Sequence, residues 1–563
     1  MGSFFLVPLV LFPLLLFLYI RFNDRALENI PKRALEVSPK RCTPQDVLST
    51  AQSLSANPVS IDDQIPPKTG RRYIVVGGAG FLGGWIVMQL LHRGENPKNI
   101  RVLDIRLPSR MDLKTGAAKD VDFKQVDVAD AKVVQEAFDA PWPAESSSTS
   151  QITVFHTAAN IRFYERIHRF VSRSSRVNVD GTQNILNSAR SIGVSTFVYT
   201  SSGSVGVFSS RYLLWPWESE PAHFVQFIND DDTRLPKRFE DYFSNYAYTK
   251  HQAETLVRKA DRSSTASGGV LRTGCIRPGN GVFGPGGDML CGAYLVRQTN
   301  PTWIASIVSH FVYVENCALA HLLYERRLID LESPSPTNPD IGGQAFAIAD
   351  PGPPPTYGDV YTTLTTLTDG ETHFPNLSPT FMLFLSYSIE FYYISRDILI
   401  SSLPFLASVI PPINGDLINL QPSLYNLTMT HLIFDDSRAR LPPSQGGLGY
   451  RGAWTTLEGL HKTAEEHYKR EDPSRRSGVA GVSLKFDFGF GFGRNKDKKK
   501  SVGDDFGKSF GSGLIRAERG VGEIGEKVKR GTGVDPVKML AHDGPGTGTN
   551  GTKANGVGKE KDE

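Results

Sequence analysis

The segment that most restricts the fold of this chain is residues 73–84, where a short apolar run passes directly into closely spaced glycines. The spacing is Gly77-x-x-Gly80-x-x-Gly83, and an apolar helical pattern follows. Glycines at this spacing permit a tight turn and let backbone N–H groups approach a pyrophosphate, while the helix N-terminus offers partial positive charge. Because strand and helix patterns flank the glycines, a dinucleotide-binding turn is favoured over a plain strand–helix turn.

From Arg71 onward, short strand patterns alternate with helical patterns, which is typical of a parallel sheet with helices on both faces. Strands are expected at 73–76, 101–104, 123–128, 153–156, 196–200 and 270–277, with a helix at about 178–192. The predicted fold is α/β: a Rossmann-type doubly wound parallel sheet with a smaller C-terminal substrate-binding lobe. The cofactor-binding core is expected in about 71–300 and the lobe in about 301–473.

The second predicted strand ends at Asp104, about 20 residues beyond the glycines, where a carboxylate can accept hydrogen bonds from a dinucleotide ribose. The same charge would repel a 2′-phosphate, so NAD is favoured over NADP. Arg106 lies nearby and leaves NADP open as the less favoured cofactor. Asp127 follows the third strand, and we expect it to contact adenine, with a turn-forming or helix-capping role as the alternative.

A second group of polar residues consists of Ser202, Tyr246 and Lys250. Tyr246 and Lys250 are four residues apart in a predicted helix and therefore share one face. An ammonium beside a phenol favours the phenolate, so Tyr246 is a candidate general base for an alcohol proton. Ser202 ends a predicted strand, where its hydroxyl could hold the substrate oxygen. Tyr248 is a near neighbour but has no lysine four residues on.

Several short motifs resemble those of the extended short-chain dehydrogenases and, within them, the 3β-hydroxysteroid dehydrogenase/isomerase family. They are Val76-Gly-Gly-Ala-Gly-Phe-Leu-Gly83, His156-Thr-Ala-Ala159, Asn178-Val-Asp-Gly-Thr182, Tyr199-Thr-Ser-Ser202, Arg277-Pro278 with Phe283-Gly-Pro285, Tyr313-Val-Glu-Asn316 with Ala320-His321, and Gly343-Gln-Ala-Phe346. The resemblance covers roughly residues 71–470, and among the members the sterol-4α-carboxylate 3-dehydrogenases look most similar.

The resemblance implies an NAD-dependent dehydrogenase that oxidises a 3β-hydroxyl on a sterol-like small molecule. If that substrate also bears a 4-carboxylate, the 3-keto product is a β-keto acid that loses CO₂ readily. A coupled double-bond isomerase activity and a dehydrogenase for another lipid or secondary-metabolite alcohol are the alternatives. A membrane-tethered scaffold that binds NAD without catalysis is a hypothesis from another class, and the catalytic residues argue against it.

Together, the patterns and the resemblance give a set of expected site residues. The catalytic residues are Ser202, Tyr246 and Lys250. The cofactor contacts are Gly77, Gly80, Phe81, Leu82, Gly83, Asp104, Asp127, Val128, Ala158, Asn178, Tyr246, Lys250 and Pro278. No metal site is expected.

One departure from the family pattern is an insertion at about 209–239, between Ser202 and Tyr246. It contains Trp215 and Trp217 and is expected over the substrate side. For the two tryptophans, a pocket role and a packing role are equally open.

The N-terminal residues 4–20 are apolar, and the first charge after them is Arg21. This length suits a transmembrane anchor (1–21), and the basic residues that follow place the rest of the chain in the cytosol. A cleaved signal peptide is the less favoured alternative, because no basic residue precedes the apolar run. Residues 22–70 are expected to be a linker. An endoplasmic reticulum location and a homodimer are further expectations.

A second apolar and aromatic stretch, at 374–413, contains the charged residues Glu390, Arg396 and Asp397. Contact with the membrane interface is favoured for it, followed by a role in the pocket or core and then by a second spanning helix. Residues 474–563 are rich in Gly and Lys and are expected to be a disordered tail.

Overall composition excludes some classes of function. The chain has a formal net charge of only +3, so no nucleic-acid partner is expected. Its four cysteines show no CxxC pair, which favours a reducing compartment.

Overall fold

The computed structural model describes residues 3–146, 149, 151–333 and 335–469, with backbone only for 3–10. Its centre is an eight-stranded sheet with the order β11-β8-β5-β4-β1-β2-β3, to which β7 adds by antiparallel pairing with β8. The bounds are β1 Arg72–Val76, β2 Ile100–Asp104, β3 Asp122–Gln125, β4 Ile152–His156, β5 Thr196–Thr200, β7 Ser263–Ser264, β8 Val270–Pro278 and β11 Ala345–Ile348. The other pairings are parallel, so the predicted α/β sheet is confirmed.

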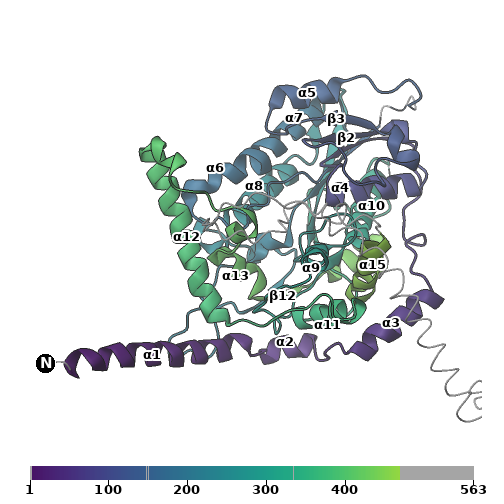
Figure 1. The fold of residues 1–563 in the computed structure, drawn as a ribbon. Coiled ribbons are helices and arrows are strands. Elements are labelled where there is room, and N and C mark those ends of the chain that lie inside the picture. Colours follow the sequence, from purple (N-terminus) through teal and green to yellow (C-terminus); the bar gives the residue numbers. More distant parts are fainter. Residues whose placement is uncertain (1–2, 147–148, 150, 334, 470–563) are drawn as a thin grey trace, which may run out of the picture. The chain divides into compact units, whose positions relative to one another are not determined.

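Helices cover both faces of this sheet (Figure 1). One face packs against α4 (Phe81–His92) and α10 (Val314–Asp330). The other packs against α5 (Ala131–Asp139), α7 (Thr182–Ser191) and α8 (Asn245–Lys259). Burial on both faces explains why β4 and β5 are buried at every position, without the polar alternation of a half-exposed strand.

The direction of strand addition reverses between β1 and β4. From β1 the chain adds β2 and β3 on one side, then returns to place β4 and later β5 on the other. Val76 pairs with both Leu103 and His156, so the carboxyl ends of three strands meet there. In open parallel sheets such a switch point is where ligands bind.

The rest of the chain builds a second hydrophobic cluster beside the sheet, around residues such as Phe283, Phe311 and Tyr425. Two small parallel sheets belong to this part, β6 with β12 and β9 with β10. The bounds are β6 Val225–Ile228, β9 Val282–Phe283, β10 Val312–Tyr313, β12 His431–Phe434, α6 Val171–Ser175, α9 Cys291–Arg297, α11 Tyr357–Leu367, α13 Pro422–Thr428, α14 Ser437–Arg440 and α15 Thr456–Lys469.

The segment 22–70, predicted as a linker, is instead structured. It contains α2 (Lys32–Val37) and α3 (Pro44–Ala56), and a capping box between Thr43 and Asp46 starts α3. Val47 is fully buried, and Arg41 forms a 2.8 Å ion pair with Asp359 at the start of α11. These contacts stabilise a segment whose composition alone suggested a flexible connection.

The N-terminal helix α1 (Ser3–Glu28) packs against α12 (Pro379–Ser402). Asn23 donates a 2.8 Å hydrogen bond to Thr380 Oγ1, and Asp24 accepts one from the Thr380 backbone. In the part of the chain that the structure describes, no helix combines the length and apolar character needed to cross a bilayer. The side chains of 3–10 lie outside that part, so the anchor at 1–21 stays a prediction. The tail at 474–563 lies outside it as well.

The 374–413 stretch contains all of α12, which is buried on one side only. Met382 and Leu383 are buried in the second cluster, whereas Phe381 and Phe391 are 59% and 73% exposed. The helix is therefore a core element and an exposed apolar surface at once.

Trp215 and Trp217, in the insertion, stack on each other and are 57% and 78% exposed. Packing in the core is thus excluded for these two side chains. The insertion contacts several elements: Leu214 bonds to α1, β6 pairs with β12, and Asp232 reaches α8. Its predicted place over the substrate side stays a prediction.

Candidate active site

The glycine turn is pressed against the end of β4. Gly77 has φ +82°, and a Cβ there would lie 2.6 Å from Thr157 Oγ1 and 2.7 Å from the Ala158 nitrogen. A Cβ on Gly83 would lie 2.2 Å from the Gly77 carbonyl oxygen. Only glycine fits these two positions, and the structure places Ala158, an expected cofactor contact, against the turn.

Helix α4 starts directly at this turn, with Gly80 as its N-cap and Phe81 and Leu82 as its first residues. No acidic side chain lies in the first turn of α4, and the N-cap offers no side-chain acceptor. The backbone N–H groups at this end suit an anion, which is the fit that a dinucleotide pyrophosphate requires.

Asp104 lies at the end of β2, beside the glycine turn. Its two carboxylate oxygens accept hydrogen bonds of 3.1 Å each from the backbone nitrogens of Ala79 and Arg106. Burial raises the pKa of this carboxyl, while the backbone donors lower it. The carboxylate is therefore fixed where the ribose of a dinucleotide is expected.

Asp127 makes the local contacts of the turn-forming alternative, and its expected adenine contact stays a prediction. It accepts a 3.0 Å hydrogen bond from the Ala129 nitrogen, as in an Asx turn, and forms a 3.0 Å ion pair with Arg176. Val128 is buried against Gly181, where a Cβ would lie 2.7 Å from Val128 Cγ2. The contacts of Asp127 and Val128 are thus with the protein's own backbone and side chains.

Asn178 joins the loop after β4 to the helix α8. Its Oδ1 accepts from the Asn160 nitrogen at 2.7 Å, and its Nδ2 donates to the Asn160 carbonyl at 3.2 Å and to Thr249 Oγ1 at 3.0 Å. The side chain is almost fully buried. The structure therefore shows Asn178 as a link between two walls of the site.

Tyr246 and Lys250 lie on α8, which Ser244 caps by accepting a 3.3 Å hydrogen bond from the Ala247 nitrogen. Burial raises the pKa of Tyr246, and a hydrogen bond with the Ser202 side chain lowers it. Ser202 Oγ also hydrogen-bonds with Ser204 Oγ at 2.7 Å. The structure thus brings together Ser202 and Tyr246, two of the three expected catalytic residues.

Lys250 is held at the carboxyl end of β5. Its ammonium donates a 2.6 Å hydrogen bond to the Thr200 carbonyl and lies 4.1 Å from the centre of the Tyr199 ring. Burial lowers its own pKa to about 7. Burial and Ser202 act on the pKa of Tyr246 in opposite directions, and the expected lowering of that pKa by Lys250 stays a prediction.

Pro278, the last residue of β8, lies against the segment that carries Ser202. A Cβ on Gly203 would lie 2.7 Å from the Pro278 carbonyl oxygen and 2.2 Å from Phe434 Cε1. The end of β8 and the turn after β5 therefore approach at backbone distance.

Two buried groups that hold this site were given no site role from the sequence: His321, quoted only as part of a family motif, and Glu254. His321, on α10, donates from Nδ1 to the Cys317 carbonyl and accepts at Nε2 from Thr200 Oγ1, each at 2.7 Å. Glu254, one helical turn beyond Lys250, accepts a hydrogen bond from Ser201 and a bidentate pair from Arg277. The four-residue spacing of Tyr246, Lys250 and Glu254 was the available signal for Glu254.

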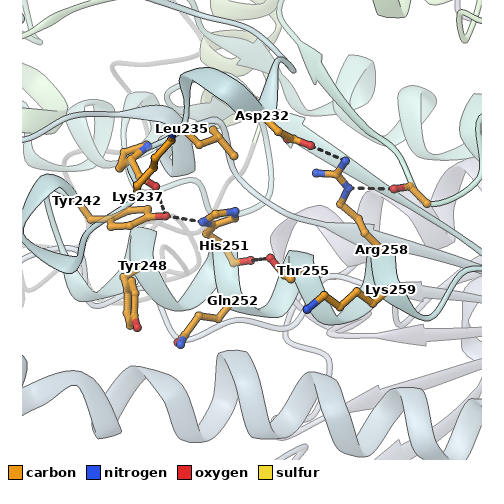
Figure 2. A pocket seen from close by; sticks show the side chains of 12 residues that line it. Asp232, Leu235, Lys237, Tyr242, Tyr248, His251, Gln252, Thr255, Arg258 and Lys259 are labelled. Carbon is orange, nitrogen blue, oxygen red and sulfur yellow. Dashed lines mark hydrogen bonds and ion pairs between the residues drawn. The ribbon is translucent and has the colours of Figure 1, made fainter.

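A cavity of about 740 Å³ lies on the outward face of α8 (Figure 2). It is lined by Asp232, Leu235, Pro236, Lys237, Tyr242, Tyr248, His251, Gln252, Thr255, Arg258, Lys259 and Gly343. Ser202, Tyr246 and Lys250 are absent from its lining, so this cavity is separate from the candidate active site.

Comparison with known proteins agrees with this geometry. Residues 74–374 match the 3-beta hydroxysteroid dehydrogenase/isomerase family. This chain belongs to that family. It is 29% identical to the decarboxylating sterol-4-alpha-carboxylate 3-dehydrogenase of Candida albicans, over 50% of this chain and 70% of that protein. It is 30% identical to mouse 3 beta-hydroxysteroid dehydrogenase type 7, over 51% and 70%.

Among solved structures, the Thermus thermophilus UDP-glucose 4-epimerase in complex with NAD is similar with a TM-score of 0.42. The identity is 19%, and the match covers 70% of this chain and 98% of that chain.

Membership of the family makes this protein an oxidoreductase of the 3β-hydroxysteroid dehydrogenase type, which acts on CH–OH groups with a nicotinamide cofactor. The glycine turn, the N-terminus of α4 and Asp104 would hold the cofactor, which accepts the hydride in such reactions. The alcohol proton is left to this chain's own residues.

Proposed function

We propose that this protein oxidises the 3β-hydroxyl of a sterol or steroid-like substrate with NAD. The observation that carries the proposal is the hydrogen bond between Tyr246, on α8, and Ser202, which follows β5. Ser202 orients the substrate oxygen, and Tyr246 takes its proton. Lys250, held by the Thr200 carbonyl, keeps a donor beside this pair for the cofactor ribose.

The preference for NAD over NADP rests on Asp104. Its carboxylate is held by two backbone N–H groups and cannot turn away without losing both hydrogen bonds. In this position a carboxylate accepts from ribose hydroxyls and repels a 2′-phosphate.

Loss of a 4-carboxylate is the favoured extension of the reaction. Oxidation at carbon 3 of a 4-carboxysterol gives a β-keto acid, which loses CO₂ readily. The name of the Candida albicans relative includes this step. The family name also includes an isomerase, which is the closest alternative activity.

The deciding experiment incubates the purified full-length protein with NAD and two matched 3β-hydroxysterols, one with and one without a 4α-carboxylate. NADH formation with CO₂ release from the first substrate alone supports the decarboxylating dehydrogenase. A conjugated enone from a Δ5 substrate supports the isomerase instead. If neither sterol reduces NAD while another lipid alcohol does, the proposed substrate class is wrong. If the protein binds NAD but turns over no alcohol, a non-catalytic scaffold is favoured.

We further propose that the protein works at a membrane, with its catalytic part facing the cytosol. The support is the apolar N-terminal sequence together with the exposed faces of α12 and the Trp215–Trp217 pair. Trp, Phe and Leu on one surface are typical of contact with a bilayer interface. Carbonate washing tests the attachment, and release of the full-length protein would contradict an anchor.

Orientation can be read from a glycosylation acceptor. Asn376, in Asn376-Leu-Ser378, is exposed, whereas Asn426 is buried and bonded to the Ser210 nitrogen, and Asn550 lies outside the described residues. Asn376 is therefore the informative site. A glycosidase-sensitive mobility shift that disappears in Asn376→Gln would overturn the cytosolic orientation.

A further inference from the structure

An ion-pair network joins α8 to β8 one helical turn beyond Lys250. Arg277, on β8, and Glu254, on α8, are both nearly inaccessible to solvent. Arg277 donates to the two oxygens of Glu254 at 2.9 Å and 2.5 Å, and Arg258 adds a longer contact at 3.4 Å. Bidentate geometry of this kind fixes both partners in place.

The insertion completes this network. Its residue Asp232 accepts from Arg277 at 2.8 Å and forms a 2.6 Å ion pair with Arg258. Figure 2 shows Asp232 reaching from the 232–237 segment toward Arg258 on α8. The network therefore holds two positive side chains, Arg277 and Arg258, and two negative ones. Without Asp232, Glu254 would be the one carboxylate paired with both arginines.

The same network contacts the catalytic groups through their chain neighbours. Ser201 donates a 2.5 Å hydrogen bond to Glu254, and Ser201 immediately precedes Ser202. Lys250 lies one helical turn before Glu254, on the same face of α8. Movement of Glu254 would thus displace Ser202 and Lys250 relative to each other.

We propose that Asp232 is a positioning residue for this dehydrogenase: through Arg277 it holds Glu254, and Glu254 holds Ser202 and Lys250 in register with Tyr246. The proposal rests on the catalytic roles given above. It assigns a function to part of the insertion that the family pattern does not contain.

The charge of Glu254 also acts on Lys250. The ionisable groups that interact with the ammonium are Cys275 on β8, Glu254 on α8, His156 on β4 and Tyr199 on β5, and Tyr246 lies one helical turn before Lys250. Of these, Glu254 and Cys275 raise the pKa of Lys250, against the lowering by burial. Loss of negative charge at Glu254, or weaker placement of it, should therefore deprotonate Lys250 at lower pH.

The test compares Asp232→Asn with Asp231→Asn in the full-length protein. Asp231 is the matched control, because it is the adjacent acid and its side chain bonds to Thr233 and pairs with Arg234, away from Arg277. We expect Asp232→Asn to lower kcat about three- to tenfold, with NAD affinity nearly unchanged. We expect kcat to fall at alkaline pH as Lys250 loses its proton, and in Asp232→Asn this fall should begin at lower pH than in the parent.

Two further variants sharpen the result. Asp232→Glu keeps the charge and should restore the parent pH profile, and Glu254→Gln should move the alkaline limb further in the same direction. If Glu254→Gln fails to fold, Asp232→Asn still decides, because Asp232 lies in an exposed turn.

A parent-like kcat and pH profile in Asp232→Asn would overturn the proposal. Equal losses in Asp231→Asn and Asp232→Asn would overturn it too, since they would show a general effect on the loop. Failure of the catalytic assignment has a different signature: Tyr246→Phe would then turn over like the parent, whatever the result at Asp232.

Discussion

The two faces of α8 carry similar residues in very different surroundings. On the inner face, Lys250 and Glu254 bond to Thr200 and Arg277 of the sheet. Tyr246, on the same face, bonds to Ser202. On the outer face, Tyr248 and His251 line an open cavity of about 740 Å³ (Figure 2).

The difference shows that the size of a cavity does not locate the chemistry here. Burial changes the pKa values of Tyr246 and Lys250 and ties them to strand ends, where a bound dinucleotide is expected. His251, on the outer face, also has a lowered pKa from burial, but its Nδ1 is engaged by the Tyr242 hydroxyl. Perturbed groups mark a site when they converge on one point, as on the inner face.

The sharpest test of this comparison exchanges each tyrosine of α8 for phenylalanine. Tyr246→Phe should lose about 10²- to 10⁴-fold in kcat while retaining NAD binding, because it removes the general base. Tyr248→Phe should stay within about twofold of the parent, since Gln252 rather than lysine lies one turn beyond it. Steady-state rates on an authentic substrate, with NAD dissociation constants, measure both. If the two variants turn over at equal rates, the inner face of α8 has no greater catalytic role than the outer face.

A second pair of similar residues lies at the strand ends. Asp104 is fixed beside the glycine turn, whereas Asp127 is occupied by Ala129 and Arg176. Asp104→Ala should weaken NAD binding about ten- to hundredfold and narrow the preference over NADP, because a charged hydrogen bond to the ribose is lost. Asp127→Ala should change NAD affinity less. A parent that binds NADP more tightly than NAD would contradict the role of Asp104.

The sequence was sufficient to predict the sheet, the glycine turn and the helix that carries Tyr246, because these depend on local patterns. Gly83 is required by a close approach to the Gly77 backbone within the same turn, so the glycine spacing together with the flanking strand and helix patterns identified the turn. The i, i+4 relation of Tyr246 and Lys250 is local in the same way. The contact of Gly77 with Thr157 and Ala158 comes from a distant part of the chain.

Contacts between distant segments could not be predicted in this way. The partner of Lys250 is a backbone carbonyl, at Thr200, which leaves no trace in side-chain patterns. Arg277 meets Glu254 and Asp232 only after β8 and the insertion have packed against α8. Likewise, α2 and α3 looked like a linker because their buried surface exists only against the rest of the fold.

The smallest expected effect concerns stability rather than rate, and it compares two lysines of α8. Lys250 is buried and its pKa is lowered from 10.5 to about 7, whereas Lys259 is exposed. Between about pH 7 and 10.5 the unfolded chain binds more protons at Lys250 than the folded protein does, so stability from this group rises with pH across that window. Below pH 7 the full unfavourable contribution of the buried charge is present.

Lys250→Met should remove this dependence. Methionine also leaves the Thr200 carbonyl without its donor, which costs about 1–3 kcal/mol at every pH. The change in the free energy of unfolding at a single pH is therefore uninformative. The informative quantity is how much that change differs between two pH values. Relative to the parent, Lys250→Met should gain at most a few kcal/mol more at pH 6 than at pH 9. Lys259→Met should show no such difference. Urea unfolding of the parent and both variants at the two pH values tests this. If the stability difference between Lys250→Met and the parent is the same at both pH values, Lys250 is not a buried group with a lowered pKa. The contrast between the two faces of α8 would then lose its basis.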